Sequence, residues 1–351
     1  MLKQKFFNHN LLTLLSYFLL SYPMFYYAYK FGVPDFGNID FYDYYHLYKN
    51  WDFSKVRSPF NTRLVSSFFI YLFNKIGFFY NAEISYHHPG IDQKVFFNAI
   101  FFNYISLVFT AFTIYKMIVY LYKNKVFAWT IGLLVFLGFG SLFYSINTLT
   151  ESFSFLLFAV IYFLYLQKNK SWIFVLLMIA VIQREYIFLV LGLVSLIEYI
   201  IKENKKYYLL IFISSILFFS IYYILRKTIF YTEDYSYQLN IYRLIENLFN
   251  PQFPIAPYIR QSLLNQNILI LYLLIIFYKY LNKLNLNCIN LLITIALILQ
   301  SHFISFAAVL GNSCGRYFYI TLPILLYFIS EEIYPLIFNY YTNPNKEHSD
   351  L

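Results

Sequence analysis

Charged residues are scarce in this chain of 351 residues. Only 12% of the residues are Asp, Glu, Lys or Arg, whereas soluble globular domains carry about 25%. Hydrophobic residues make up 60% of the chain. This balance excludes an ordinary soluble enzyme. It predicts an all-α integral membrane protein, in which each spanning helix takes about 20 apolar residues.

Cysteine is almost absent, because the chain has only Cys288 and Cys314. About one membrane span separates the two on the topology given below, so no structural disulfide is expected. The net charge of +9 requires no nucleic-acid partner, because basic residues accumulate beside membrane spans. No segment resembles a nucleic-acid-binding module.

The apolar runs predict a single transmembrane domain, residues 1–351. We expect ten spans, at residues 11–29, 95–121, 127–147, 150–166, 172–184, 186–201, 207–226, 267–281, 286–309 and 317–334. The first is predicted to be a retained helix and no signal peptide, because it is long enough to span and no small-residue cleavage site follows it. A multi-pass protein of the plasma (inner) membrane is therefore expected.

Lysines in the short turns predict the orientation. If both termini are cytoplasmic, these lysines all fall on the cytoplasmic side, where basic residues accumulate. They are Lys123, Lys125, Lys168, Lys170, Lys202, Lys205, Lys206, Lys279 and Lys283. A span at residues 64–80 would reverse this pattern, so we expect that stretch, which contains Asn74 and Lys75, to be an interfacial helix on the outer surface.

Two large outer loops follow from this topology, at residues 31–94 and 226–266. All seven arginines fall on the outer side, whereas the inner turns use lysine. The planar guanidinium binds phosphate or carboxylate with two parallel hydrogen bonds. Arg184 and Arg316 adjoin apolar runs, where an ionisable group is costly and is a functional candidate. The others at headgroup level can simply contact lipid phosphates; these are Arg57, Arg226, Arg243 and Arg260.

Gln183, Arg184 and Glu185 stand between two apolar pieces that are each short for a full span. The pattern predicts a broken hairpin whose polar side chains line a water-accessible cavity in the outer half of the membrane. The alternative is an internal pair of Arg184 with Glu185 or with Glu151 that serves only packing. Glu151 opens a helix, where the helix dipole favours a carboxylate and Thr150 is placed to cap.

Arg316 follows a polar, glycine-bearing turn, residues 311–315, that opens the last predicted span. Backbone N–H groups at a helix start, together with an arginine, favour phosphate binding. A plain glycine turn with an arginine that faces the headgroups has the same pattern.

The first outer loop carries acids at Asp35, Asp40, Asp43 and Asp52. Asp40 and Asp43 share one face of a helix. A carboxylate at the outer surface suits a sugar-transferring enzyme, because the acceptor hydroxyl must lose its proton as the lipid phosphate departs. Paired acids could instead bind a divalent metal, or could be solvated acids that balance nearby basic residues. No metal site is assigned, because the spacing of residues 87–92 matches no strong ligand signature.

These features resemble the C-type (GT-C) superfamily of membrane glycosyltransferases, particularly its bacterial polyprenyl-phosphate-sugar-dependent members. The similar segments are Asp-Phe-Tyr-Asp-Tyr-Tyr at 40–45, Pro-Phe-Asn-Thr-Arg-Leu at 59–64, Thr-Glu-Ser at 150–152, Gln-Arg-Glu at 183–185, and Gly-Arg-Tyr at 315–317 with Pro323. The resemblance covers most of the chain in layout. The adjacent acid pair of many members and the outer soluble domain of larger members are absent.

The resemblance implies an outer-facing cavity in which one sugar passes from a polyprenyl-phosphate-linked donor to a glycan, lipid or protein acceptor. It implies Asp40 as the general base, with Asp43 as its alternate. It also implies residues that bind the donor phosphate or orient the groups around it. These are Arg63, Glu151, Arg184, Glu185 and Arg316.

Two other functions fit the same residues. A transporter or flippase for lipid-linked saccharides would also place arginines in a membrane cavity, but transporters commonly show paired halves with matching broken helices, and no second half is found. An O-antigen-type polymerase would use arginine-rich outer loops, as in residues 226–266, which contain Arg243 and Arg260.

Overall fold

A computed structural model describes residues 2–31, 40–58, 60–77, 91–144, 148–203, 205–231, 245, 267–307 and 314–342. Every regular element in these ranges is helical, which confirms the all-α class. The helices are α1 (Leu2–Phe31), α2 (Asp40–Asn50), η1 (Phe60–Thr62), α3 (Leu64–Ile76), α4 (Gln93–Tyr122), α5 (Lys125–Leu137), α6 (Phe139–Tyr144), α7 (Glu151–Leu166), α8 (Lys170–Val181), α9 (Tyr186–Ile201), α10 (Lys205–Thr228), α13 (Asn267–Leu281), α14 (Cys288–Ala307), α15 (Cys314–Tyr319) and α16 (Leu322–Thr342).

Four helical segments in the described ranges are long and apolar enough to cross a membrane: His9–Phe31, Gln93–Tyr122, Lys205–Thr228 and Cys288–Ser305. Six further apolar helices have only 10–17 residues. Each predicted span coincides with helical residues, but these lengths identify four candidate spans where the sequence predicted ten.

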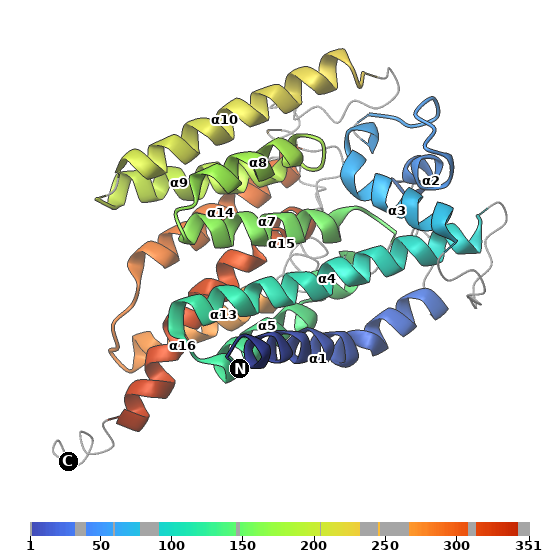
Figure 1. Cartoon of the computed structure of the whole chain (residues 1–351). Coiled ribbons are helices and arrows are strands. Elements are labelled where there is room, and N and C mark those ends of the chain that lie inside the picture. Colours follow the sequence, from blue (N-terminus) through green and yellow to red (C-terminus); the bar gives the residue numbers. More distant parts are fainter. Residues whose placement is uncertain are drawn as a thin grey trace.

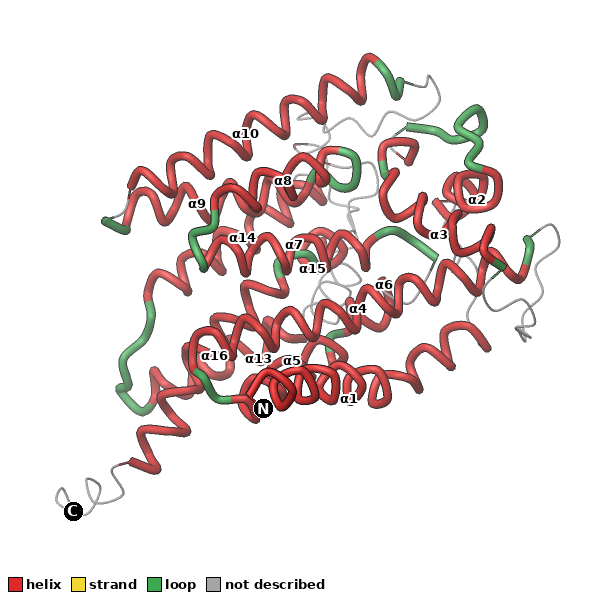
Figure 2. Tube along the Cα trace, in the orientation of Figure 1, coloured by secondary structure: helices red, strands yellow, loops and turns green. Residues whose placement is uncertain are grey.

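Most helices run side by side along one direction (Figure 1). The pairs α9 and α10, α4 and α5, α4 and α7, and α1 and α4 pack along one another. The turns between α4 and α5, α7 and α8, and α9 and α10 gather at one end (Figure 2). This shared end carries the turn lysines, as the predicted orientation requires.

Asparagine fixes two of these turns. Asn124 accepts a hydrogen bond of 3.0 Å from the backbone N–H of Phe127 and caps α5. Asn169 accepts one of 3.5 Å from Trp172 at the start of α8. Asparagine favours this position because its side-chain oxygen satisfies an N–H group that the helix leaves unpaired.

Helix α3 forms where the interfacial helix was expected, and its polar side faces inward. Ser66 and Asn74 are buried, whereas Phe68 and Phe69 are 45% and 39% exposed. Asn74 donates a 3.0 Å hydrogen bond to the backbone oxygen of Tyr48. Burial of polar groups and exposure of apolar ones suits a helix whose outer side meets lipid, where apolar side chains cost nothing.

Two predicted spans are interrupted. The segment 127–147 divides into α5 and α6 at Gly138, whose backbone is extended. The segment 317–334 divides into α15 and α16 at Ile320 and Thr321. Pro323 stands in the first turn of α16, where the missing N–H of proline has no helical partner to lose.

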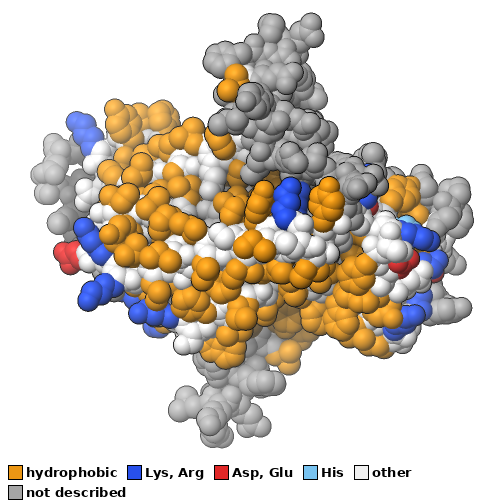
Figure 3. Space-filling model, turned by 90° about the horizontal axis from the view of Figure 1, so that it is seen from above, with side chains coloured by type: hydrophobic (Ala, Val, Ile, Leu, Met, Phe, Trp, Pro, Cys, Tyr) orange, Lys and Arg blue, Asp and Glu red, His pale blue; other side chains and the backbone are white. Residues whose placement is uncertain are grey.

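Hydrophobic side chains cover most of the surface over α10, and lysine and arginine lie mainly toward the two ends of the molecule (Figure 3). On α10, Ile213, Ile216, Leu217 and Ile224 are more than half exposed. A soluble protein rarely exposes so large a continuous apolar area. The surface is therefore compatible with a membrane protein.

Candidate functional site

The loop between α8 and α9 carries the polar sequence that predicted a broken hairpin. Gln183 is 1% exposed. Its Nε2 donates to Ser66 Oγ at 3.1 Å, to Ser154 Oγ at 3.0 Å and to the backbone oxygen of Thr150 at 3.3 Å. The backbone N–H of Ser66 donates back to Gln183 Oε1 at 3.1 Å. Gln183 thus joins the hairpin to α3 and to the start of α7.

Arg184 forms a buried ion pair with Glu151. Its Nη2 donates to Glu151 Oε1 at 2.9 Å, and the two side chains are 3% and 4% exposed. The predicted cap by Thr150 does not form, and its hydroxyl donates to the Tyr44 hydroxyl at 3.4 Å. The other amino group of Arg184, Nη1, is buried and has no hydrogen-bond acceptor in the described part of the chain.

Arg63 connects the predicted first outer loop to this hairpin. It follows η1, is 4% exposed, and donates from Nη1 to the hydroxyl oxygen of Tyr44 on α2. Its Cζ atom lies 5.4 Å from the Phe60 ring centre and 5.8 Å from that of Tyr44. Guanidinium groups over aromatic faces are stabilised by the ring quadrupole. The rings thus stabilise a buried cation at this position.

Glu185 lies among positive charges. Burial opposes its ionisation, but Arg63, Arg184 and Arg226 lower the pKa of this carboxyl below its ordinary value. Its Oε2 is buried and has no donor in the described part of the chain. Arg226, at the end of α10, also donates from Nε to Ser58 Oγ at 3.4 Å. We call Arg63, Glu151, Arg184, Glu185 and Arg226 the arginine cluster. Its guanidinium groups outnumber its carboxylates by one.

The two candidate catalytic acids lie on α2. Asp43 is 4% exposed and accepts two hydrogen bonds from the Arg57 side chain, Nε to Oδ1 at 3.1 Å and Nη2 to Oδ2 at 2.7 Å. It also accepts one from the Arg57 backbone at 3.1 Å. Asp40 is the first residue of α2, and its side chain lies outside the described part of the structure. Position 40 is one helical turn before Tyr44, the residue that contacts Arg63.

Arg316 lies in α15, and its side chain is outside the described part of the structure. Its neighbour Tyr317 packs on Tyr186 with ring centres 4.7 Å apart. Tyr186 in turn lies beneath the Arg184 guanidinium, at 5.1 Å. Residue 316 is therefore adjacent in sequence to Tyr317, whose side chain packs against the hairpin.

Metal ligands do not gather in the described ranges, where no three His, Cys, Asp or Glu side chains form a group that could hold an ion. His87 and His88 lie outside the described residues, as does most of the second predicted outer loop, residues 232–266 apart from Ile245. Cys288 is exposed and free.

Sequence reasoning missed three members of this site. Tyr44 was treated only as part of an aromatic segment, Ser66 as part of an apolar helix, and Arg226 as a lipid contact. For Ser66 a signal was present, because Ser66 and Asn74 are eight residues apart and so share one side of an apolar helix. No local sequence pattern indicated Tyr44 or Arg226, because their partners are distant in the sequence.

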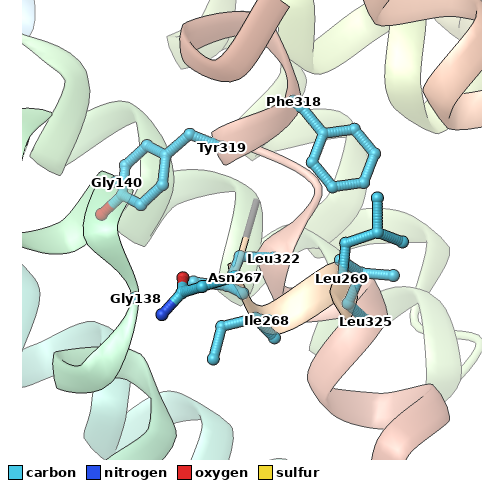
Figure 4. A pocket seen from close by; sticks show the side chains of 9 residues that line it. All are labelled: Gly138, Gly140, Asn267, Ile268, Leu269, Phe318, Tyr319, Leu322 and Leu325. Atoms are coloured by element: carbon cyan, nitrogen blue, oxygen red, sulfur yellow. The ribbon is translucent and has the colours of Figure 1, made fainter. Parts of the chain in front are cut away.

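A small pocket lies where α6 and α15 approach (Figure 4). Its volume is about 20 Å³, and it is lined by Gly138, Gly140, Asn267, Ile268, Leu269, Phe318, Tyr319, Leu322 and Leu325. That is room for about one water molecule. The pocket is too small to be the predicted sugar cavity.

The arginine cluster combines three guanidinium groups with two carboxylates, and Arg184 Nη1 has no acceptor in the described part of the chain. It lies where the first outer loop, the α8 and α9 hairpin and the ends of α7 and α10 meet. No protein-family model, no curated protein and no solved structure matches the chain.

Proposed function

We propose that this protein is a membrane glycosyltransferase that transfers one sugar from a lipid-linked phosphate donor to an acceptor hydroxyl. The observation that supports this proposal is the arginine cluster. Arg184 Nη1 is buried without an acceptor, and an arginine N–H left so at membrane depth is costly. A donor phosphate would supply the missing acceptor.

Helix α2 supplies the acid in this proposal. The Asp43 carboxylate is engaged by Arg57 through both of its oxygens, so its role is to hold α2 against the following loop. Asp40 is the proposed general base. It takes the proton of the acceptor hydroxyl, the acceptor oxygen bonds to the anomeric carbon, and the bond between that carbon and the phosphate oxygen breaks.

The arginines stabilise the leaving group. The departing lipid phosphate gains negative charge, and preorganised guanidinium groups stabilise that charge without reorganisation. Arg63 and Arg184 are held by rings and by Glu151, and we include Arg316 through its neighbour's contact with the hairpin. Glu185 and Glu151 orient these cations. A polyprenyl-phosphate-sugar donor of the GT-C type is the proposed substrate class.

The proposed topology keeps ten spans in the plasma membrane, with the lysine turns in the cytoplasm and the arginine cluster outside. In this arrangement the short helices α8 and α9 cross only part of the bilayer, and their polar turn lines the proposed outer-facing cavity. The proposal also keeps the prediction that residues 1–351 form a single transmembrane domain.

The test is incubation of the purified protein with a panel of lipid-linked sugars while release of the lipid phosphate is followed. We expect release with one donor class and an at least 100-fold lower rate in Asp40→Asn, because loss of a general base typically costs about 10²- to 10⁴-fold. Asp52→Asn is the matched control, since Asp52 lies on the same loop and its carboxylate accepts local hydrogen bonds from Ser54. No release with any donor would contradict the proposal.

A transporter of lipid-linked saccharides is the second candidate. It is favoured by the two broken helices, α5 with α6 and α15 with α16, which approach each other at Gly140 and Tyr319. Discontinuous helices are a mark of transporters. Proteoliposomes separate the two functions, because a transporter moves the intact lipid-linked sugar between leaflets, whereas a transferase splits it.

A further inference from the structure

Four aromatic side chains gather where α2 ends beside α3. The Trp51 ring lies 5.2 Å from Phe53, 5.5 Å from Phe68 and 5.8 Å from Tyr71, measured between ring centres. Phe53 is 38% exposed and Phe68 is 45% exposed, and Trp51 and Tyr71 are partly exposed. We call these four residues the aromatic patch. Its rings pack on one another and still present apolar area to the surroundings.

The backbone of Trp51 is left-handed, with a φ of 57°. Its N–H donates to the Leu47 oxygen at 3.1 Å, and the N–H of Asp52 donates to the His46 oxygen at 3.3 Å, so the chain leaves α2 by a tight turn. Glycine usually takes the left-handed position after a helix, as Gly77 does after α3. A bulky residue is unfavourable there. The turn itself therefore gives no reason for a tryptophan, and the reason lies in what its ring contacts.

The apolar surface of the patch continues along α3. Phe68, Leu72 and Ile76 follow one another at intervals of one helical turn and are 45%, 37% and 65% exposed. Lys75 is also exposed, and its ammonium lies 5.3 Å from the centre of the Tyr71 ring. Tryptophan, tyrosine and lysine beside an apolar surface are typical of the boundary between lipid and water, because their polar tips reach headgroups while their apolar parts contact acyl chains.

The length of α4 places the patch at the level of a headgroup region. Helix α4 has 30 residues and is apolar enough to cross a membrane. It is about 45 Å long, close to the thickness of a bilayer with its headgroups, about 40–45 Å. One end of α4 precedes the turn lysine Lys123, and at the other end the N–H of Asp92 donates to the Tyr45 hydroxyl of α2 at 3.0 Å (Figure 1). A helix that crosses with its lysine turn in one headgroup region thus has α2 at the opposite one.

We propose that the aromatic patch anchors the end of α2 in the lipid leaflet opposite the turn lysines, with the Trp51 ring at the boundary between headgroups and acyl chains. On the proposed topology this is the outer leaflet. Lipid is favoured over a saccharide as the partner because the exposed apolar side of α3 continues the patch. The inference does not depend on glycosyl transfer, because it concerns only where the chain meets lipid.

The test uses tryptophan fluorescence of the full-length protein in vesicles of phosphatidylcholine and phosphatidylglycerol. The chain has three tryptophans, so the emission of Trp51 is the difference between the Trp172→Phe variant and the double variant with Trp51→Phe and Trp172→Phe. Trp129, whose N–H donates to Ser16 Oγ, stays in both proteins. Phenylalanine keeps an aromatic ring at each position, so the variants should fold.

We expect lipids brominated near the headgroup end of the acyl chain to quench Trp51 about twofold, and more strongly than lipids brominated near the methyl end or iodide in the water. Trp172 is the matched control. It is 59% exposed near the start of α8, beside the turn lysine Lys170. The difference between Trp51→Phe and the double variant should therefore show the same order of quenching at the opposite headgroup region.

Each other result would contradict the anchor. Stronger quenching of Trp51 by iodide than by either lipid would place the ring in water, and stronger quenching by the methyl-end bromines would place it in the hydrocarbon core. No quenching by any of the three would show that protein covers the patch. Emission that ignores brominated lipids and changes with soluble oligosaccharides would assign the patch to a saccharide. Any of these four outcomes would overturn the proposal.

Discussion

Ser66 and Gln183 exchange hydrogen bonds in both directions although 117 residues separate them. The Ser66 N–H would otherwise be a free donor near the start of α3, because the first turn of a helix leaves its N–H groups unpaired. An amide side chain both accepts and donates, so one glutamine satisfies the helix start and holds the hairpin turn. The first outer loop and the α8 and α9 hairpin are thereby fixed to each other.

Gln183→Leu should destabilise the protein more than Gln300→Leu. The first variant removes four hydrogen bonds and leaves buried partners unsatisfied, each at about 1 to 3 kcal/mol. The second removes a single bond, from Nε2 to the Leu189 backbone oxygen. Thermal unfolding of both variants in the same detergent checks this order. Equal midpoints would show that the Ser66 to Gln183 link adds no stability.

The Arg184 and Glu151 pair offers a test that separates stability from phosphate binding. Arg184→Ala alone should cost about 3 to 5 kcal/mol, because it leaves a buried carboxylate without its partner. Replacing both residues with methionine should restore most of that loss, since apolar substitutes for a buried pair are often neutral. We expect the double variant to fold and to bind the lipid-phosphate donor at least tenfold more weakly. A fully active double variant would show that the Arg184 and Glu151 pair serves only packing.

Asp40 and Asp43 should respond differently to substitution. Asp40→Asn keeps the side-chain volume and cannot accept a proton at neutral pH, so turnover should fall by about 10²- to 10⁴-fold with little change in stability. Asp43→Asn should mainly lower stability, because it weakens the bond to Arg57. Turnover rates and thermal unfolding midpoints, measured on both variants, test this difference. The reverse pattern would exchange the two roles.

Gly140 allows α6 and α15 to approach closely. A Cβ atom at this position would lie 2.4 Å from Cδ2 of Tyr319, so Gly140→Ala should cost about 1 to 3 kcal/mol through overpacking. Tyr319→Ala in the same chain should relieve that clash. Gly192→Ala is the control, because its Cβ would meet Ser215 Cβ at an ordinary 3.4 Å. An unaffected Gly140→Ala protein would show that the two helices separate easily.

The orientation can be tested by cysteine labelling in sealed cells, after Cys288 and Cys314 are replaced by serine. A membrane-impermeant reagent should modify a cysteine placed at position 40 or 240. It should leave cysteines at positions 124 and 204 unmodified, because these lie among the turn lysines. Labelling at 124 or 204 would reverse the proposed topology.

Helix positions could be predicted from the sequence because an apolar run has no alternative to a helix in lipid. The breaks between α5 and α6 and between α15 and α16 were not predicted. Gly138 and Gly140 surround a single phenylalanine in the middle of one apolar run, a spacing that lowers helix propensity and could have marked the division between α5 and α6. Whether a polar face turns inward or outward, as in α3, depends on neighbouring helices that one segment does not reveal.

The candidate site was likewise predicted only in part, because contacts between distant helices leave no local pattern in the sequence. The pairing of Arg184 with Glu151 was one of the alternatives that the sequence left open, and the structure contains it. The contribution of Arg226 to the environment of Glu185 depends on how α10 packs on α9, which has no local signature. Glu331 and Glu332 lay inside a predicted span, where two adjacent acids are costly, and Glu332 pairs with Lys279 of α13.

The lengths of α8 and α9 have a consequence for the surrounding lipid. With 12 and 16 residues, they are about 18 Å and 24 Å long, less than the hydrocarbon core of about 30 Å. Hydrophobic mismatch of this size is relieved when the adjacent leaflet thins. A thinned leaflet beside these two helices would lower the headgroups of neighbouring lipids toward the turn between α8 and α9.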